Sequence, residues 1–236
     1  MKFIVCENYD EMSAKAAEFI KKEIENDPHC VLGLATGSSP VGMYEKLAGM
    51  CLDFSSVTTV NLDEYYPISP ENENSYRYFM NKNLFDRVNI KKENTHGPDG
   101  TAPDPDAECA RYDALIRALG GIDLQVLGIG KNGHIGFNEP SDSLVADTHV
   151  TALSESTIKA NSRFFASESD VPKRALTMGM ASIIESRKII LLASGKSKHA
   201  AISALFDGKI TPMIPATFLK IHRDVTVICD KEAYEG

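Results

Sequence analysis

The sequence lacks the long apolar segment that a membrane-spanning helix requires. None of its apolar runs approaches the roughly 18 residues that identify such a helix. Its composition, 43% hydrophobic and 25% charged residues, is that of an ordinary globular protein. The chain begins with Met-Lys-Phe-Ile-Val, a strand pattern without the apolar core and cleavage site of a secretion signal. We therefore expect a cytoplasmic protein with no membrane partner.

An excess of positive charge is also missing. Lys and Arg total 25 against 33 Asp and Glu, which gives a net charge of -8. Because proteins that bind nucleic acid usually carry a basic face, we expect no nucleic-acid partner. A small anionic ligand is still compatible with this charge, since a local site can override the net charge.

The cysteines show neither a metal-binding nor a disulfide pattern. There are five, with no Cys-x-x-Cys pair, and most lie within or beside apolar segments. This distribution indicates reduced, buried thiols. Internal repeats and low-complexity tracts are absent as well, so the 236 residues are expected to form a single domain spanning residues 1–236.

Short apolar runs alternate along the chain with amphipathic segments. The predicted strands are residues 2–6, 30–35, 57–62, 124–127, 188–193 and 225–229, with an irregular strand at 146–153. The predicted helices include residues 12–24, 41–50, 74–85, 106–119 and 175–184, and residues 91–105 are expected to be a polar loop. This alternation predicts an α/β fold: a Rossmann-like, doubly wound, mostly parallel sheet with helices on both faces.

The stretch Gly-Ile-Gly-Lys-Asn-Gly-His-Ile-Gly-Phe-Asn-Glu-Pro at residues 128–140 concentrates residues suited to catalysis. Three glycines follow a predicted strand and let the backbone turn sharply and approach a ligand. His134 can move protons near neutral pH, and the carboxylate of Glu139 follows five residues later. We therefore interpret this stretch as a catalytic turn.

Three other interpretations fit the same residues, and the simplest is that His134 is only a hydrogen-bonded residue of a turn. The spacing Gly128-x-Gly130-x-x-Gly133 matches a dinucleotide-binding fingerprint, which needs a helix to begin at the third glycine. Residues 138–140, Asn-Glu-Pro, interrupt any such helix. His134 and Glu139 could ligate a metal, but no third His or Cys stands at ligand spacing. We expect neither a cofactor nor a metal.

Polar residues follow other predicted strands too. The segment Thr36-Gly37-Ser38-Ser39 lies between a strand and a helix, where free backbone N–H groups can bind an anion. A simple helix cap explains this turn equally well. Asp63 ends the third predicted strand, and Lys198 follows the strand at 188–193. Because the carboxyl ends of parallel strands meet at one sheet edge, these groups are expected to share a site.

Residues 154–172 form a polar segment that contains Arg163. Such a segment could be a surface helix or a mobile lid that closes on a ligand. With the anion turn, the lysine, the histidine and the carboxylates, it predicts a phosphorylated small molecule that undergoes proton transfer.

Four motifs together resemble those of the glucosamine-6-phosphate deaminase family. They are Leu34-Ala-Thr-Gly-Ser-Ser-Pro40, Asn61-Leu-Asp-Glu-Tyr65, the stretch 128–140, and Asn161-Ser-Arg-Phe-Phe165. The likeness spans nearly the whole chain and implies a Rossmann-like fold. It implies an enzyme of amino-sugar catabolism, of hydrolase or isomerase type, that converts glucosamine 6-phosphate and water to fructose 6-phosphate and ammonium without a cofactor.

The resemblance also implies roles for individual residues. His134 would move the proton that opens the sugar ring, Glu139 would orient this histidine, and Asp63 would carry the proton from C2 to C1. Some members have an aspartate where this chain has Asn132, so ring opening here is expected to depend on Glu139. Thr36 to Ser39, Arg163 and Lys198 would hold the phosphate.

Two alternatives to a deaminase remain open at this point. A 6-phosphogluconolactonase of the same fold also carries Gly-His after a glycine turn, but it has no C2 proton to remove. A non-catalytic sugar-phosphate sensor would usually carry a further DNA-binding or partner domain. Allosteric deaminases bind an effector with an Arg-x-Lys pair, where this chain reads His149-Val150-Thr151. We therefore expect a monomer or small homo-oligomer without that response.

Overall fold

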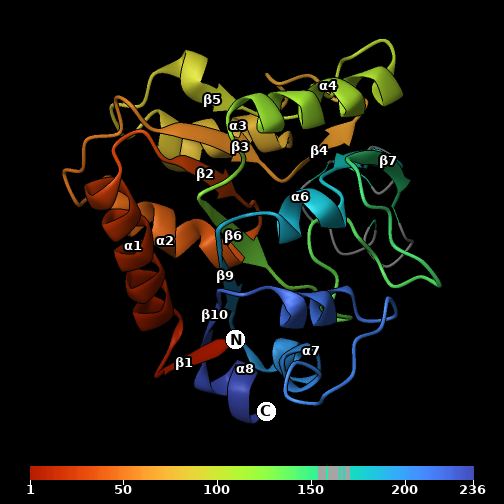
Figure 1. The fold of residues 1–236 in the computed structure, drawn as a ribbon. Helices are drawn as coiled ribbons and strands as arrows, with labels where there is room; N and C mark the ends of the chain where they lie inside the picture. Colours follow the sequence, from red (N-terminus) through yellow and green to blue (C-terminus); the bar gives the residue numbers. More distant parts are fainter. Residues whose placement is uncertain (154–157, 159–164, 166, 168–170) are drawn as a thin grey trace.

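A computed structural model describes residues 1–236 apart from 154–157, 159–164, 166 and 168–170. Its centre is a seven-stranded sheet in which every neighbouring pair of strands is parallel. In spatial order the strands are β1 (Lys2–Cys6), β10 (Val225–Asp230), β9 (Lys188–Ala193), β6 (Leu124–Gly128), β2 (Val31–Leu34), β3 (Thr58–Asn61) and β5 (Thr95–His96) (Figure 1). The predicted parallel sheet is thereby confirmed.

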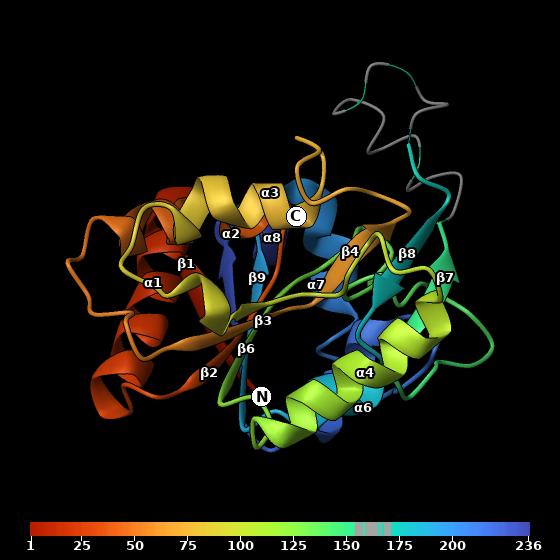
Figure 2. The ribbon, with the colours of Figure 1, turned by 90° about the horizontal axis from the view of Figure 1, so that it is seen from above.

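Helices cover both faces of this sheet, as expected for a doubly wound fold. One face carries α1 (Tyr9–Asn26), α2 (Ser38–Ala48), α3 (Tyr76–Met80) and the π-helical turn η1 (Asn81–Phe85). The other carries α4 (Pro105–Ala118), α6 (Met180–Ile184), α7 (His199–Ser203), the 3-10 turn η6 (Pro215–Ile221) and α8 (Lys231–Glu235). Figure 2 shows the sheet edge-on between α1 and α2 on one side and α4 and α6 on the other.

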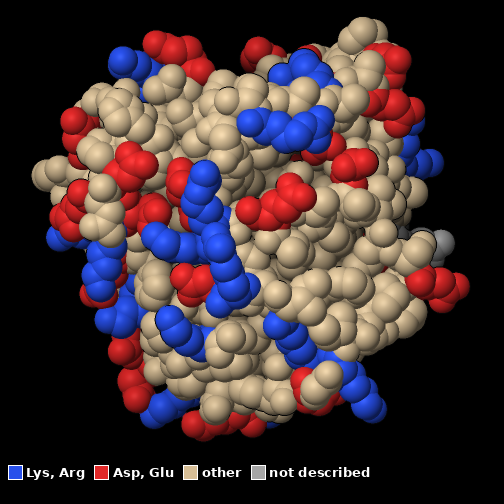
Figure 3. Space-filling model, viewed as in Figure 1, with Lys and Arg blue, Asp and Glu red and all other residues tan. Residues whose placement is uncertain are grey.

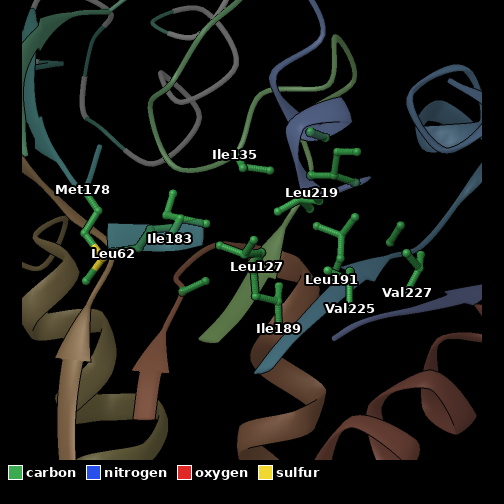
Figure 4. Close-up of a cluster of buried hydrophobic side chains, with 14 of the residues drawn as sticks. Leu62, Leu127, Ile135, Met178, Ile183, Ile189, Leu191, Leu219, Val225 and Val227 are labelled. Carbon is green, nitrogen blue, oxygen red and sulfur yellow. The ribbon is translucent and has the colours of Figure 1, made fainter. Parts of the chain in front are cut away.

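Each face buries its own hydrophobic core. Figure 4 shows part of the core beneath α6 and η6, where Leu127 and Leu191 of the sheet lie near Ile183 and Leu219 of the covering elements. On the opposite face, Met12, Ala16, Ile20 and Ile24 form the buried stripe of α1. These residues recur at every fourth position and belong to the apolar stripe from which the helix was predicted. Burial on both faces therefore fixes the sheet and leaves its carboxyl edge to carry polar groups.

A second, smaller sheet was not predicted. It has three antiparallel strands in the order β4 (Asp63–Tyr66), β8 (Arg174–Thr177) and β7 (His149–Ala152). The predicted helix at 175–184 is wrong in its first part, because these residues pair as a strand and the helix α6 begins only at Met180. Strand β5, with the short turn η2 (Lys92–Asn94) before it, also lies in the segment expected to be a loop.

The surface carries both signs of charge. On the face in Figure 3, acidic and basic side chains are interspersed rather than segregated into a single basic patch. Among the described helices, none has the length and apolar character that crossing a membrane would require.

Candidate active site

The strand order of the large sheet reverses between the neighbouring strands β2 and β6. From β2 the chain runs outward to β3 and β5, whereas from β6 it runs the other way to β9 and β10. Open α/β sheets bind ligands in the crevice beyond the carboxyl ends of strands at such a point. The turns after β2 and β6 do meet here, since a Cβ on Gly128 would lie 4.0 Å from Oγ of Ser39.

The turn after β2 has the features of an anion-binding turn. Gly37 has a φ of +91° and precedes α2 without a side chain that caps the helix. The helix begins at Ser38, three residues earlier than predicted, so Ser38 and Ser39 belong to its first turn. Uncapped N–H groups and the helix dipole both favour a negative ligand at this end.

Tyr9 holds the start of α2 in place, a role that no sequence motif indicated. Its hydroxyl donates a 2.8 Å hydrogen bond to the carbonyl of Ser38 and accepts one of 2.8 Å from the N–H of Gly42. The first turn of α2 is therefore tied to α1.

The turn after β6 folds back on itself within six residues. The N–H of Gly130 donates to the carbonyl of His134 at 2.9 Å, and the N–H of Gly133 donates to the carbonyl of Gly130 at 3.0 Å. Gly133, at a φ of +84°, occupies backbone space that other residues rarely adopt. Residues 129–148, all of them described, contain no helix, so the dinucleotide interpretation fails as expected.

Three of the predicted catalytic residues contact one another in this turn. Nδ1 of His134 lies 3.2 Å from Oε1 of Glu139, close enough for an ion pair but without the alignment of a hydrogen bond. The amide of Asn132 donates a 2.8 Å hydrogen bond to Oε2 of the same carboxylate. The backbone N–H of His134 in turn donates to Oδ1 of Asn132 at 3.2 Å. Glu139 thus lies beside the imidazole, and Asn132 joins this carboxylate to the backbone of His134.

Lys198 reaches the same edge of the sheet from another strand. It lies in the turn η5 (Lys196–Lys198) after β9, and its Nζ donates a 2.6 Å hydrogen bond to the carbonyl of Ile129. Burial, and then the charge of Lys131, lower the pKa of this ammonium. Asp230, at the end of β10, fixes the turn by accepting hydrogen bonds from the N–H of Gly195 at 3.0 Å.

Asp63 lies two residues beyond the end of β3, as the first residue of β4. It is 7% exposed, and burial followed by the charge of Glu64 raises the pKa of its carboxyl to about 8. Burial raises the pKa of Glu64 to about 7, although the N–H groups of Tyr65, Tyr76 and Arg77 donate to its carboxylate. A carboxyl group that titrates near neutral pH is suited to proton transfer.

Thr177 connects Asp63 to the glycine turn. It pairs with Asp63 across β4 and β8, and its Oγ1 accepts a 3.1 Å hydrogen bond from the N–H of Phe137. The side chain is fully buried. Sequence reasoning missed this residue because it assigned residues 175–184 to a helix, which hides a strand-to-strand pairing.

Arg163 and most of the expected lid at 154–172 lie outside the described residues. Within the part of the chain that the structure describes, no three His, Cys, Asp or Glu side chains group as metal ligands. The arrangement thus combines an uncapped helix start, a lysine, a histidine beside a carboxylate and a buried carboxyl at the carboxyl end of the sheet.

Comparison with known proteins gives consistent similarities. Residues 7–228 match the family model described as glucosamine-6-phosphate isomerases/6-phosphogluconolactonase. A glucosamine-6-phosphate deaminase of Thermoanaerobacter sp. (strain X514) is 55% identical over 99% of this chain and 94% of its own length. One of Clostridium perfringens (strain ATCC 13124) is 53% identical over 99% of this chain and 98% of its own length. The names of these relatives give no support to the expected hydrolase class.

Solved structures agree in fold. A structure titled as a monomeric glucosamine-6-phosphate deaminase superposes with a TM-score of 0.96 at 47% identity, covering 99% of this chain and 98% of its own. A 6-phosphogluconolactonase from Thermotoga maritima superposes with a TM-score of 0.77 at 22% identity, covering 98% of this chain and 99% of its own. The second likeness concerns the fold alone.

Proposed function

The chain belongs to the family of glucosamine-6-phosphate isomerases and 6-phosphogluconolactonases, and we propose that it is a glucosamine-6-phosphate deaminase. The reaction converts glucosamine 6-phosphate and water to fructose 6-phosphate and ammonium. The observation that carries this proposal is the buried carboxyl of Asp63 at the sheet edge that also holds the His134–Glu139 pair. The two groups supply the two proton transfers that the reaction requires.

Ring opening needs a group that moves a proton between the ring oxygen and the C1 hydroxyl. His134 suits this step because an imidazole can donate a proton from one ring nitrogen and accept one at the other. Glu139 stabilises the protonated ring by its charge, at 3.2 Å from Nδ1, and the amide of Asn132 holds that carboxylate in place. Asn132 itself adds no charge, so the carboxylate of Glu139 is the group that favours the imidazolium.

Isomerisation then requires removal of the proton at C2 of the open-chain sugar. Asp63 is the proposed base, which takes this proton and returns it at C1. Its pKa of about 8 makes the ionised carboxylate a stronger base than an exposed aspartate. The neighbouring aldehyde acidifies C2. Return of the proton at C1 leaves an iminium at C2, and water adds to this carbon and displaces the nitrogen as ammonium, which gives the ketose phosphate.

The phosphate group is assigned to the turn from Thr36 to Ser39 and to Lys198. The helix start supplies N–H donors and a positive dipole end, and the lysine supplies a full charge. Arg163, which lies outside the described residues, and a lid over residues 154–172 are included on the family resemblance alone. The phosphate would anchor the sugar so that C1 and C2 meet the proton-transfer groups.

The proposal extends to the setting of the enzyme. We propose that the enzyme is a single-domain, cytoplasmic protein of amino-sugar catabolism. It would be active as a monomer or small homo-oligomer. The monomeric structure that is 47% identical to this chain supports this assembly state. A sugar-phosphate sensor is disfavoured because Asp63, His134 and Glu139 are all retained.

The decisive experiment measures ammonium released when glucosamine 6-phosphate is added to the purified protein. Asp63→Asn should retain substrate binding and lose turnover by about 10²–10⁴-fold, since the amide keeps the shape and removes the basicity. Exchange of the C2 proton with deuterated solvent should stop in parallel. Hydrolysis of 6-phosphogluconolactone in place of ammonium release, undiminished in Asp63→Asn, would favour the lactonase instead.

A further inference from the structure

The end of strand β8 lies between the proposed base and the glycine turn at 128–140. Asp63 and Thr177 are paired directly across β4 and β8, so their side chains project from the same face of the small sheet, with Cβ atoms about 5 Å apart. The contact continues one residue further, where the N–H of Met178 donates a 2.9 Å hydrogen bond to the carbonyl of Leu62. Strand β8 therefore fixes the backbone on which the proposed base stands.

The hydroxyl of Thr177 holds the glycine turn on the other side. Its Oγ1 accepts a 3.1 Å hydrogen bond from the N–H of Phe137 and donates a longer one, of 3.3 Å, to the carbonyl of Met178. A Cβ at Gly136 would lie 2.9 Å from this Oγ1, so the turn packs directly against the hydroxyl. Thr177 is fully buried, so Oγ1 is the partner on which the N–H of Phe137 depends.

Asn138 makes a second connection between the glycine turn and β8. Its side-chain amide donates hydrogen bonds of 2.9 Å to the carbonyl of Met178 and 3.0 Å to the carbonyl of Ile135. Its backbone N–H also donates to the carbonyl of Ile135, at 3.2 Å, which closes the turn over residues 135–138. The side chain is buried, so these bonds are shielded from water.

We propose that Thr177 and Asn138 are positioning residues that set the distance between the two proton-transfer groups of the active site. The segment that they anchor lies between His134 and Glu139, and Asp63 is tied to the same strand by backbone pairing. Both groups act on neighbouring atoms of one sugar, and a shift of 1 Å in a catalytic group can cost about a hundredfold in rate. This proposal rests on the proposed deaminase function.

The first test replaces Thr177 in the full chain and measures steady-state kinetics on glucosamine 6-phosphate. Thr177→Val keeps the branched shape and the strand pairing but removes the acceptor for the N–H of Phe137. The expected result is a kcat lowered roughly tenfold to a hundredfold, with a KM within about twofold of the wild type. The KM should hold because Lys198, assigned to the phosphate, is bonded to Ile129 at the opposite end of the turn.

Two further variants separate position from stability. Thr177→Ser keeps the hydroxyl and should restore most of the wild-type kcat. Thr148→Val is the matched control, since it removes another buried threonine hydroxyl, one that donates to the carboxylate of Asp113 and joins the segment before β7 to α4. It should lower the thermal midpoint and leave the kcat of the folded enzyme unchanged.

Asn138→Leu tests the same anchor from the glycine turn and gives an answer even if Thr177→Val does not fold. It nearly keeps the side-chain volume and removes both amide N–H donors. The kcat should fall while the KM stays near the wild-type value. In the double variant the loss of kcat should be smaller than the product of the two single losses, because both substitutions release the same turn.

The outcomes separate the positioning role from the function. If the wild type releases ammonium from glucosamine 6-phosphate but folded Thr177→Val and Asn138→Leu keep its kcat, the positioning role is refuted and the function stands. A kcat that Thr148→Val lowers as much as Thr177→Val does, or that Thr177→Ser fails to recover, would also refute it. If the wild type shows no deamination, the proposed function fails and the positioning role fails with it.

Discussion

The imidazole of His134 lies directly against the backbone of Gly130. A Cβ at residue 130 would lie 2.3 Å from both Nδ1 and Cε1 of the ring, well inside van der Waals contact. The backbone of Gly130 is not in the left-handed region, so alanine is allowed there by its φ. The glycine is therefore required by the histidine and not by the turn.

Gly130→Ala should displace the imidazole from Glu139 and lower kcat by about a hundredfold, since a shift of 1 Å in a catalytic group can cost that much. Steady-state kinetics on glucosamine 6-phosphate measure the effect. Gly208→Ala, in open space, is the control that should behave as wild type. A Gly130→Ala enzyme with normal kcat would show that the position of His134 is not critical.

Lys198→Ala should weaken phosphate binding. Loss of a hydrogen bond to a charged group costs about 1.5–3 kcal/mol, so the KM for glucosamine 6-phosphate should rise roughly tenfold to 150-fold. Lys196→Ala, an exposed lysine in the same turn, should leave the KM unchanged. Equal turnover of glucosamine with and without its phosphate by the wild type would contradict the assignment of the anion site.

The rate should depend on pH through Asp63. The proposed base acts only when ionised, and its pKa is raised to about 8. We therefore expect kcat/KM, which reports the free enzyme, to fall as the pH is lowered below about 8. A profile measured between pH 5 and 10 that stays flat from pH 8 down to pH 6 would exclude a base with this raised pKa.

Asp63 should also lower stability as the pH rises. Its folded-state pKa of about 8 exceeds its usual value of 3.8, so the native state binds more protons than the unfolded state between these values. The contribution of Asp63 to stability is thus present below pH 3.8 and is lost as pH rises through 8. Asp63→Asn has no carboxyl group to ionise and so avoids this loss. The free energy of unfolding measured with urea should therefore exceed that of the wild type by an amount that grows from pH 3.8 to about pH 8.

Asp53 provides a control of opposite sign. Hydrogen bonds from Ser55, and then from Asn89, lower its pKa to about 2. The contribution of Asp53 to stability is present above pH 3.8, its usual pKa, and is lost as the pH falls through 2. Asp53→Asn should therefore reduce stability at neutral pH. If both variants change stability in the same direction at pH 8, burial of Asp63 does not have the proposed consequence.

N-acetylglucosamine 6-phosphate, the effector of the allosteric deaminases, should not activate this enzyme. At the position of the basic pair of allosteric relatives, β7 carries His149 and Thr151, and Nδ1 of His149 lies 2.9 Å from the carbonyl of Asp147. An effector that does not bind cannot shift a conformational equilibrium. Rate curves should be hyperbolic with and without the compound. A sigmoidal curve that becomes hyperbolic on its addition would contradict this prediction.

Much of the fold could be predicted because its signals are local. The stripe from Met12 to Ile24 and the apolar runs of β2, β6 and β9 specify their own structure by periodicity and burial. The strands β4 and β8 were missed or misassigned because they are short and are stabilised by pairing between segments distant in sequence, whereas β7 lies within the irregular strand predicted at 146–153. Such pairing leaves little trace in any single segment.

The sequence by itself determined that polar residues collect at the carboxyl edge of a parallel sheet, and which residue types they are. Only the tertiary structure decided their relationships: Lys198 against the carbonyl of Ile129, and Thr177 between Asp63 and the glycine turn. These contacts join residues far apart in the chain. The raised pKa of Asp63 follows from the same cause, because burial is a property of the packed chain and not of the residue.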